Sequence, residues 1–385
     1  MEQNPYWITN RIKSNDKRTR AITSLTASLK ITDWLSLQAR GTVDYTHDTY
    51  NQKMYASTAP AIAGSNGRYI DLNHTETLYY GDFMAMFNKK WDDFALTGAI
   101  GGSINSTTVN SLRLDSKTAS LYYPNQFSVA NIIMSTASYI DQQIDAHRQL
   151  QSLFATAQVG YKDIFFLDLT ARNDWSSTLA FTPNEKKGFF YPSVGGAWVM
   201  SKMFRLSEFI SFGKLRAVWS KVGNDIPLYI TNPVSHVGAG GEIEYADSAP
   251  FENMKPEMTT SVELGTEWRF LNDRISFSGT YYKTNTRNQF FKLPAKSGDK
   301  YAYRYVNAGD IQNIGWEVSV SALPVVGKDF EWKSSLNYST NKNKVVRLHE
   351  ELPVFIYGPR GFSSSYAMKL VEGGSFGDIY GKAFR

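Results

Sequence analysis

Residues 21–45, AITSLTASLKITDWLSLQARGTVDY, alternate between mostly apolar and polar side chains on both sides of a short connection. Odd-numbered positions up to residue 31 are mostly apolar, as at Leu25 and Leu29, and the positions between them are polar. After the connection at residues 32–34, the same alternation resumes. A period of two with a polar opposite face predicts two half-buried, antiparallel β-strands.

This pattern of two alternating segments repeats along the chain. We predict twelve strands at residues 21–31, 35–45, 75–87, 94–104, 153–161, 165–174, 189–199, 214–222, 261–270, 275–281, 316–322 and 330–338. Much longer segments rich in Gly, Pro, Asn, Ser and Tyr separate the pairs, at residues 46–73, 105–149, 175–188, 223–258 and 286–312. Short turns that alternate with long loops predict an all-β, antiparallel transmembrane β-barrel, with an apolar face toward lipid and a polar face toward a lumen.

A soluble β-sandwich is the competing interpretation, because its strands also alternate. Strand length favours the barrel: sandwich strands are usually about 5–6 residues long, whereas most of these segments alternate over the roughly 9–11 residues that a tilted strand needs to cross a bilayer. Aromatic residues also gather near the strand ends, for example Trp34, Trp91 and Trp268. Amphipathic rings favour the boundary between lipid and water.

Composition excludes several classes of function. The chain has no cysteine, so disulfides and cysteine-based metal sites or nucleophiles are excluded. The net charge of +5 comes from scattered Lys and Arg residues, and we expect no nucleic-acid partner. The first five residues show no basic or apolar leader, although an outer-membrane protein needs a signal peptide. We therefore expect this chain to be a piece of a longer one.

Five short motifs, in order along the chain, carry a resemblance to a known family. They are RNDWSS at 172–177, FYPSVGGAW at 190–198, LRA at 215–217 with VGN at 222–224 and PEMTTSVELG at 256–265, NAGDIQNIGWE at 307–317, and VEGGSFGDIYG at 371–381. Together they resemble the SusC/RagA family of TonB-dependent outer-membrane transporters from Bacteroidetes-type bacteria. Residues 1–149 match this family only as generic barrel hairpins.

The resemblance implies a location in the bacterial outer membrane and about twelve strands of a 22-stranded plugged barrel. Residues 1–385 would form part of one barrel domain, and we expect further strands after the tail at 383–385. The resemblance also implies TonB-driven import of glycans or peptides, with a SusD-like surface lipoprotein as partner. The signal peptide, the plug and the TonB-binding segment of the family are not visible in this sequence.

Catalytic chemistry is not indicated. Residues 373–377 match the G-x-S-x-G pattern of hydrolases, but no histidine follows Ser375, and we interpret the stretch as a glycine-rich loop. The five histidines are widely separated, and we interpret them as solvated loop residues. We expect no enzyme activity, no cofactor and no metal.

Two sets of residues are candidates for contacts. Aromatic residues in the predicted loops could stack on sugar rings or pack against peptide side chains, or could instead form the interfacial girdle or contact a partner protein: Tyr122, Tyr123, Phe127, Tyr229, Tyr245, Phe290, Phe291, Tyr301, Tyr303 and Tyr305. Charged residues on the polar strand face could contact the lumen or the plug, or could simply pair along the wall: Arg172, Asp174, Glu263, Glu267 and Arg269.

The principal hypothesis is therefore an importer segment that walls a wide polar lumen and carries exterior loops. Two alternatives stay open. A soluble or surface-anchored β protein could hold polysaccharide with its aromatic loops, and a siderophore or vitamin receptor would share the same barrel.

Overall fold

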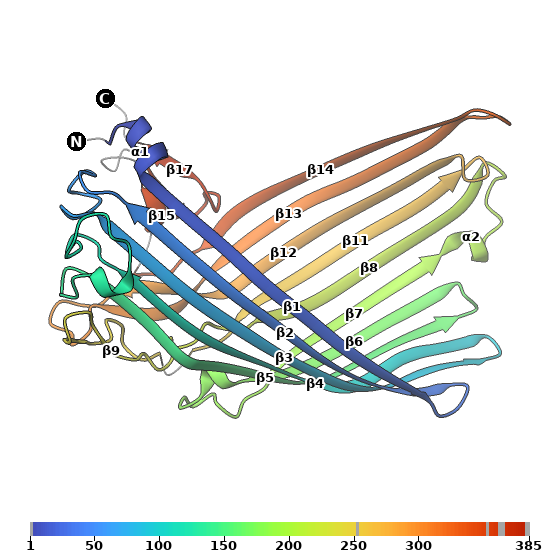
Figure 1. Cartoon of the computed structure of the whole chain (residues 1–385). Coiled ribbons are helices and arrows are strands. Elements are labelled where there is room, and N and C mark those ends of the chain that lie inside the picture. The colour runs from blue at the N-terminus through green and yellow to red at the C-terminus, as the bar shows by residue number, and fades with distance from the viewer. Residues whose placement is uncertain (1–2, 252–253, 352–353, 361–365, 382–385) are drawn as a thin grey trace.

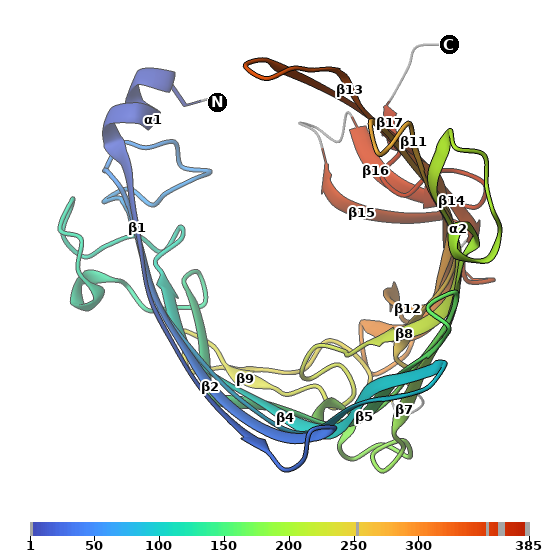
Figure 2. The same ribbon diagram turned by 90° about the vertical axis from the view of Figure 1, so that its right-hand side faces the viewer.

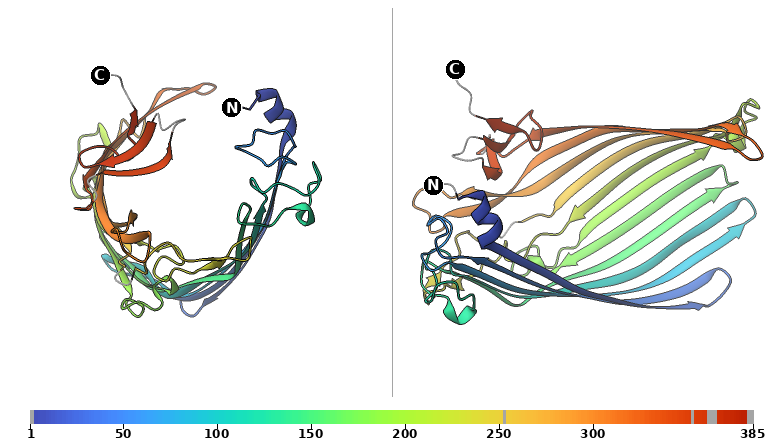
Figure 3. Two further views of the ribbon diagram at one scale, coloured as in Figure 1. Left: turned by 90° about the vertical axis from the view of Figure 1, so that its left-hand side faces the viewer. Right: turned by 45° about the horizontal axis from the view of Figure 1, so that its top comes forward.

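The fold is a single curved β-sheet that forms an open trough (Figures 1 and 2). In this computed structural model the described residues are 3–251, 254–351, 354–360 and 366–381. Twelve antiparallel strands pair in the order β1-β2-β3-β4-β5-β6-β7-β8-β11-β12-β13-β14. Strands β1 and β14 form the two rims of the trough (Figure 3). The predicted twelve-stranded antiparallel sheet is confirmed, and the sheet is not closed.

The strands of the sheet are long. They are β1 (Ile12–Lys30), β2 (Leu35–Met54), β3 (Arg68–Trp91), β4 (Phe94–Asp115), β5 (Tyr139–Tyr161), β6 (Phe165–Ser176), β7 (Phe189–Val199), β8 (Ile210–Asn224), β11 (Glu257–Phe270), β12 (Ile275–Pro294), β13 (Tyr303–Val326) and β14 (Glu331–Arg347). Smaller elements are α1 (Pro5–Arg11), η1 (Val129–Asn131), η2 (Ser177–Leu179), α2 (Met200–Met203), β9 (His236–Val237), β10 (Ile243–Glu244), β15 (Val354–Arg360), β16 (Tyr366–Val371) and β17 (Ile379–Gly381).

The register aligns the apolar rows of all strands on the convex face. Leu25 pairs with Gly41, for example, and Ala85 pairs with Ile100. These rows are not covered by a second layer: Leu25 is 77% exposed and Ile100 is 62% exposed. The sandwich alternative is therefore wrong, because its apolar rows would be sealed against another sheet.

The predicted loops were too long. Residues 46–54 continue β2, 105–115 continue β4, 139–149 begin β5, and 303–312 begin β13. Apolar alternation is needed only where a strand contacts lipid. Beyond the bilayer the backbone still pairs with its neighbour while both faces meet water, so the sequence loses its alternation although the strand continues.

The buried apolar clusters belong to these extensions and to the loops between them. One cluster contains Tyr69, Leu114, Leu121 and Ile132, and another contains Leu179, Ile226, Ile230 and Met254. They order the loop end of the wall, on the left in Figure 1, whereas the short turns lie at the opposite end. No helix among the described residues is long and apolar enough to cross a membrane.

Strands β15, β16 and β17 form a small separate sheet on the concave side, near β14 (Figure 2). Backbone hydrogen bonds join Val345 of β14 to Gly373 and Gly374, each at 2.8 Å. Leu370 of β16 packs with Val345 and Phe291. The glycine-rich stretch that matches the hydrolase pattern is thus the turn between β16 and β17, as expected. The predicted continuation at 383–385 lies outside the described residues.

Candidate functional site

The concave face of the sheet is polar and rich in ion pairs. Arg18 and Arg20 of β1 each form a two-pronged hydrogen bond with a carboxylate of β2, at Asp48 and Asp44. Arg40 of β2 forms an ion pair with Asp82 of β3, with 2.6 Å between Arg40 Nη2 and Asp82 Oδ2. These pairs were not predicted from the sequence, although Arg40 and Asp44 both lie on the polar side of residues 35–45.

The charged residues that we predicted form two local pairs. Arg172 donates from Nε to Asp174 Oδ1 at 2.7 Å and from Nη2 to Ser152 Oγ at 2.7 Å. Arg269 Nη2 lies 3.1 Å from Glu267 Oε1. Glu263 accepts a long hydrogen bond of 3.4 Å from Ser261. The two pairs come from distant strands, so the structure does not unite the five residues in one site; a contact with the plug stays a prediction.

The RNDWSS motif and the adjacent Thr178 connect the end of β6 to the β8–β11 loop by hydrogen bonds. Ser176 Oγ and Thr178 Oγ1 donate to the two carboxylate oxygens of Asp225, at 2.8 and 2.9 Å. Asp225 directly follows β8, so this cluster joins the end of β6 to the start of the long β8–β11 loop. Thr231 of that loop also donates to the Thr178 carbonyl at 2.7 Å.

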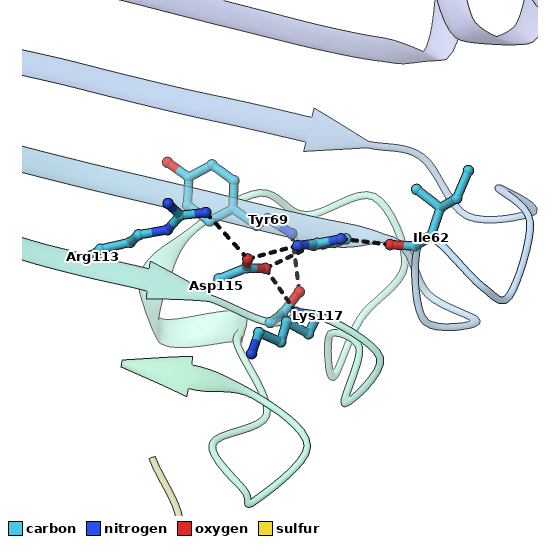
Figure 4. A network of polar contacts seen from close by, with 7 residues as sticks. Ile62, Tyr69, Arg113, Asp115 and Lys117 are labelled. Atoms are coloured by element: carbon cyan, nitrogen blue, oxygen red, sulfur yellow. Dashed lines mark hydrogen bonds and ion pairs between the residues drawn. The ribbon is translucent and has the colours of Figure 1, made fainter. Parts of the chain in front are cut away.

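A second network holds the loop ends of β3 and β4 (Figure 4). Arg68 donates from Nε and Nη2 to the two oxygens of Asp115, each at 2.7 Å, and from Nη1 to the Ile62 carbonyl at 2.8 Å. The Lys117 amide also donates to Asp115, at 2.9 Å. Burial by itself would raise the pKa of Asp115, but these hydrogen bonds and the nearby arginines outweigh it and hold the pKa below its usual value.

The most promising binding feature is a groove of about 550 Å³ at the loop end of the wall. It lies between the first residues of β5 and the β8–β11 loop, which folds over the concave side (Figures 2 and 3). Three of the predicted aromatic residues line it, namely Tyr229, Tyr245 and Tyr305. The structure brings these three together although they are far apart in the sequence.

Polar groups accompany the tyrosines in this groove. Hydrogen bonds from Lys292 and Ser248 hold the pKa of Asp247 below its usual value, and Lys292 Nζ lies 2.8 Å from the Asp247 carboxylate. Asp141 and Glu244 add two further carboxylates. His236, which we expected to be a solvated loop residue, also lines the groove. No pattern in the sequence indicated these polar residues, because only the folding of the β8–β11 loop brings His236, Glu244 and Asp247 close to Asp141 of β5.

The remaining predicted aromatics lie elsewhere. Tyr122 and Tyr123 are exposed on the β4–β5 loop. Phe127 packs against Tyr55, with ring centroids 5.1 Å apart. The ring of Tyr301 faces the ammonium group of Lys300. None of these four residues lines the groove.

Four of the aromatic residues that we assigned to loops lie in strand extensions instead, so that assignment was wrong. Phe290 and Phe291 are in β12, whereas Tyr303 and Tyr305 are in β13. Phe291 is buried against Phe355 and Leu293. Phe290 packs against the cluster around Leu179.

The arrangement can bind a polar molecule through ring faces, hydroxyl groups and carboxylates. Within the described part of the chain, no group of three or more histidine and acidic residues is arranged to hold a metal ion.

Comparisons with known proteins agree with this geometry. The family model described as "TonB dependent receptor-like, beta-barrel" matches residues 2–356. TonB-dependent receptor P3 of Formosa agariphila is 29% identical over 264 residues, which are 66% of this chain and 26% of that protein. TonB-dependent receptor SusC of Bacteroides thetaiotaomicron is 29% identical over 234 residues, which are 55% of this chain and 23% of that protein. The chain thus spans about a quarter of the length of these relatives.

Solved structures show the same fold. The RagAB peptide importer in its open-open state superposes with a TM-score of 0.76 and 17% identity, over 96% of this chain and 40% of that one. The siderophore receptor PiuA of Acinetobacter baumannii superposes with a TM-score of 0.56 and 11% identity, over 88% of this chain and 49% of that one. The family model, the SusC relative and the shared fold agree: this chain belongs to the TonB-dependent receptor β-barrel family of the outer membrane, and it is similar in sequence to SusC and in fold to RagAB.

Proposed function

We propose that the intact protein imports glycans or peptides across the outer membrane, driven by TonB. In this proposal the chain forms about half of the barrel wall, and residues 1–385 belong to one barrel domain. The tyrosine-lined groove on the concave side carries the proposal, because a solute that enters from the loop end meets it before it reaches the lumen.

The chemistry of the groove suits either class of solute. Tyrosine rings stack on sugar rings and also pack against peptide side chains, and their hydroxyl groups exchange hydrogen bonds with both. The structural relative RagAB is a peptide importer, which supports a peptide as one of the two candidates. The proposal includes a SusD-like surface lipoprotein as partner at the loop end, where Tyr122 and Tyr123 are exposed.

Uptake of labelled glycans and of labelled peptides by cells that carry the full-length gene tests this function. Replacement of Tyr229 and Tyr245 by Ala should raise the solute concentration needed for half-maximal uptake roughly tenfold, because each lost ring contact is worth about 0.5–1.5 kcal/mol. Tyr6→Ala is the matched control, since Tyr6 and Tyr245 are similarly exposed, at 81% and 79%, but Tyr6 does not line the groove.

The outcomes separate the parts of the proposal. Uptake that continues after TonB is uncoupled would contradict active import. A double variant that imports as well as the Tyr6→Ala control would contradict the groove as a contact site. Uptake of a ferric siderophore in place of glycan and peptide would support the alternative receptor class.

A further inference from the structure

The lipid-facing wall contains an apolar furrow of about 880 Å³ that crosses the strands from β6 to β13. Most of a barrel wall is a convex surface of interleaved side chains. Here several small residues follow one another across neighbouring strands, so the wall is hollowed. Gly196 of β7 pairs with Ala217 of β8, and Thr266 of β11 pairs with Gly279 of β12. All four line the furrow.

Large apolar side chains stand on both sides of this floor. Trp198 and Leu215 are paired neighbours on the side toward the short turns. Tyr281 and Trp316 stand on the side toward the loops, with ring centroids 4.8 Å apart. The furrow therefore runs between two ridges of large side chains, and its lining is almost entirely apolar.

The furrow begins at the turn end of the wall, which is the periplasmic end of a barrel of this family. Phe165 is the first residue of β6, and its ring stacks on Trp198 near the end of β7, with centroids 6.0 Å apart. Trp198 also meets the ring of Phe204 at 5.7 Å. Residues 200–209 therefore lie beside the mouth of the furrow.

This neighbouring segment carries positive charge. It contains Lys202, Arg205 and one acidic residue, Glu208. Lys202 lies 3.9 Å from Asp163 in a loose ion pair. Arg205 is exposed, and it makes no ion pair or hydrogen bond with another described residue. A free guanidinium group suits a phosphate, which it can bind with two parallel hydrogen bonds.

We propose that the furrow is a binding site for one phospholipid of the periplasmic leaflet. One acyl chain lies along the floor between the two ridges, and the phosphate meets Arg205. The furrow is continuous with the apolar face that contacts the bilayer, so hydrocarbon chains are already the surrounding medium. The basic residues lie at the end where that leaflet has its headgroups. This inference depends on the outer-membrane location of the family and is independent of the proposed solute.

Native mass spectrometry of the full-length protein tests the site, with dioleoyl phosphatidylethanolamine added in detergent. Gly196→Leu fills the floor. A Cβ atom at this position would lie 4.0 Å from its nearest neighbour, the Phe166 carbonyl oxygen, so the new side chain can extend into the furrow. We expect this variant to lose one retained lipid per protein, or to bind it at least tenfold more weakly.

Gly41→Leu is the matched control. Gly41 occupies the same convex face on β2, and a Cβ atom there would meet nothing within 4 Å. It should retain lipid like the wild type. Arg205→Gln should weaken retention severalfold without changing the furrow itself.

A second readout locates the acyl chain. Phospholipids with brominated acyl chains quench the fluorescence of nearby tryptophan residues. The contribution of Trp198 to this quenching is the part that is lost on Trp198→Phe. We expect that contribution to be smaller in the Gly196→Leu variant than in the wild type. Equal lipid retention in wild type, Gly196→Leu and Gly41→Leu would overturn the proposal. So would an oligomer that forms through this face and is abolished by Gly196→Leu, because a second protein would then be the occupant.

Discussion

At the scale of single residues, specific partners hold Asp115, the most buried charged residue in the described part of the chain. Asp115 is 1% exposed, yet it is ionised because Arg68 supplies two hydrogen bonds and the Lys117 amide supplies a third (Figure 4). Removal of one member of a buried pair leaves the other charge without compensation, and this costs more than the pair contributes.

We therefore expect Asp115→Asn to destabilise the ends of β3 and β4 that face the long loops by about 2 kcal/mol, because Arg68 loses the carboxylate that it binds. Hydrogen exchange of residues 116–138 in the full-length protein measures this local change. Asp141→Asn is a suitable control, since Asp141 forms no ion pair with another described residue. Equal exchange in the two variants would contradict a structural role of Asp115.

The depressed pKa of Asp115 gives this region a pH dependence with a definite sign. A carboxyl group whose pKa is lowered by folding stabilises the folded state above its unfolded pKa of about 3.9, and this contribution is lost as the pH falls through the folded value. Protection of residues 116–138 should therefore decrease below about pH 4 in the wild type. In Asp115→Asn the same decrease should be smaller.

At the scale of elements, sequence alternation located all twelve strands but underestimated their length. The apolar row of β13 is visible from Trp316 onward, whereas its first part at 303–312 has no such row. Lipid contact imposes the pattern that can be read from the sequence, and strand pairing beyond the bilayer imposes none. The groove could be predicted only in part: composition indicated Tyr229 and Tyr245, but the contact of their loop with β5 depends on tertiary structure.

The NAGD motif shows how a strand extension is shaped. The side-chain amide of Asn307 donates to the carbonyls of Lys255 and Asn288 and accepts from the Lys255 amide, at 2.7–2.8 Å. Both Asn288 and Gly309 have positive φ angles, of 59° and 85°. Asn307 thus joins the end of the β8–β11 loop to an irregular point between β12 and β13.

We expect Asn307→Ala to release the returning end of the β8–β11 loop, because three hydrogen bonds are lost at once. Each is worth about 1 kcal/mol, so local protection at residues 254–258 should fall by roughly 2–3 kcal/mol in hydrogen exchange. Asn51→Ala on β2 provides the control. Protection that is unchanged by Asn307→Ala would mean that the apolar cluster around Met254 holds this loop without the motif.

At the scale of the whole molecule, the sheet has two unpaired rims. Within the described residues β1 pairs with no strand except β2, and β14 pairs with no strand except β13; the backbone of β14 also bonds to the β16–β17 turn at Val345. A rim in hydrocarbon leaves backbone N–H and C=O groups without partners, and each costs several kcal/mol because no water can satisfy them. Barrels avoid this cost by closure.

This chain produced alone should therefore fail to form a stable monomer in detergent micelles. Size-exclusion chromatography with light scattering should show aggregates or self-paired oligomers, since rim strands are templates for further pairing. The full-length protein should elute as a discrete species that resists unfolding in cold SDS, as closed barrels have no free rim to pair. A monodisperse, folded monomer of residues 1–385 would show that this wall can bend to pair β1 with β14. In that case a twelve-stranded barrel would be a complete unit, and the wide lumen on which the import proposal depends would not exist.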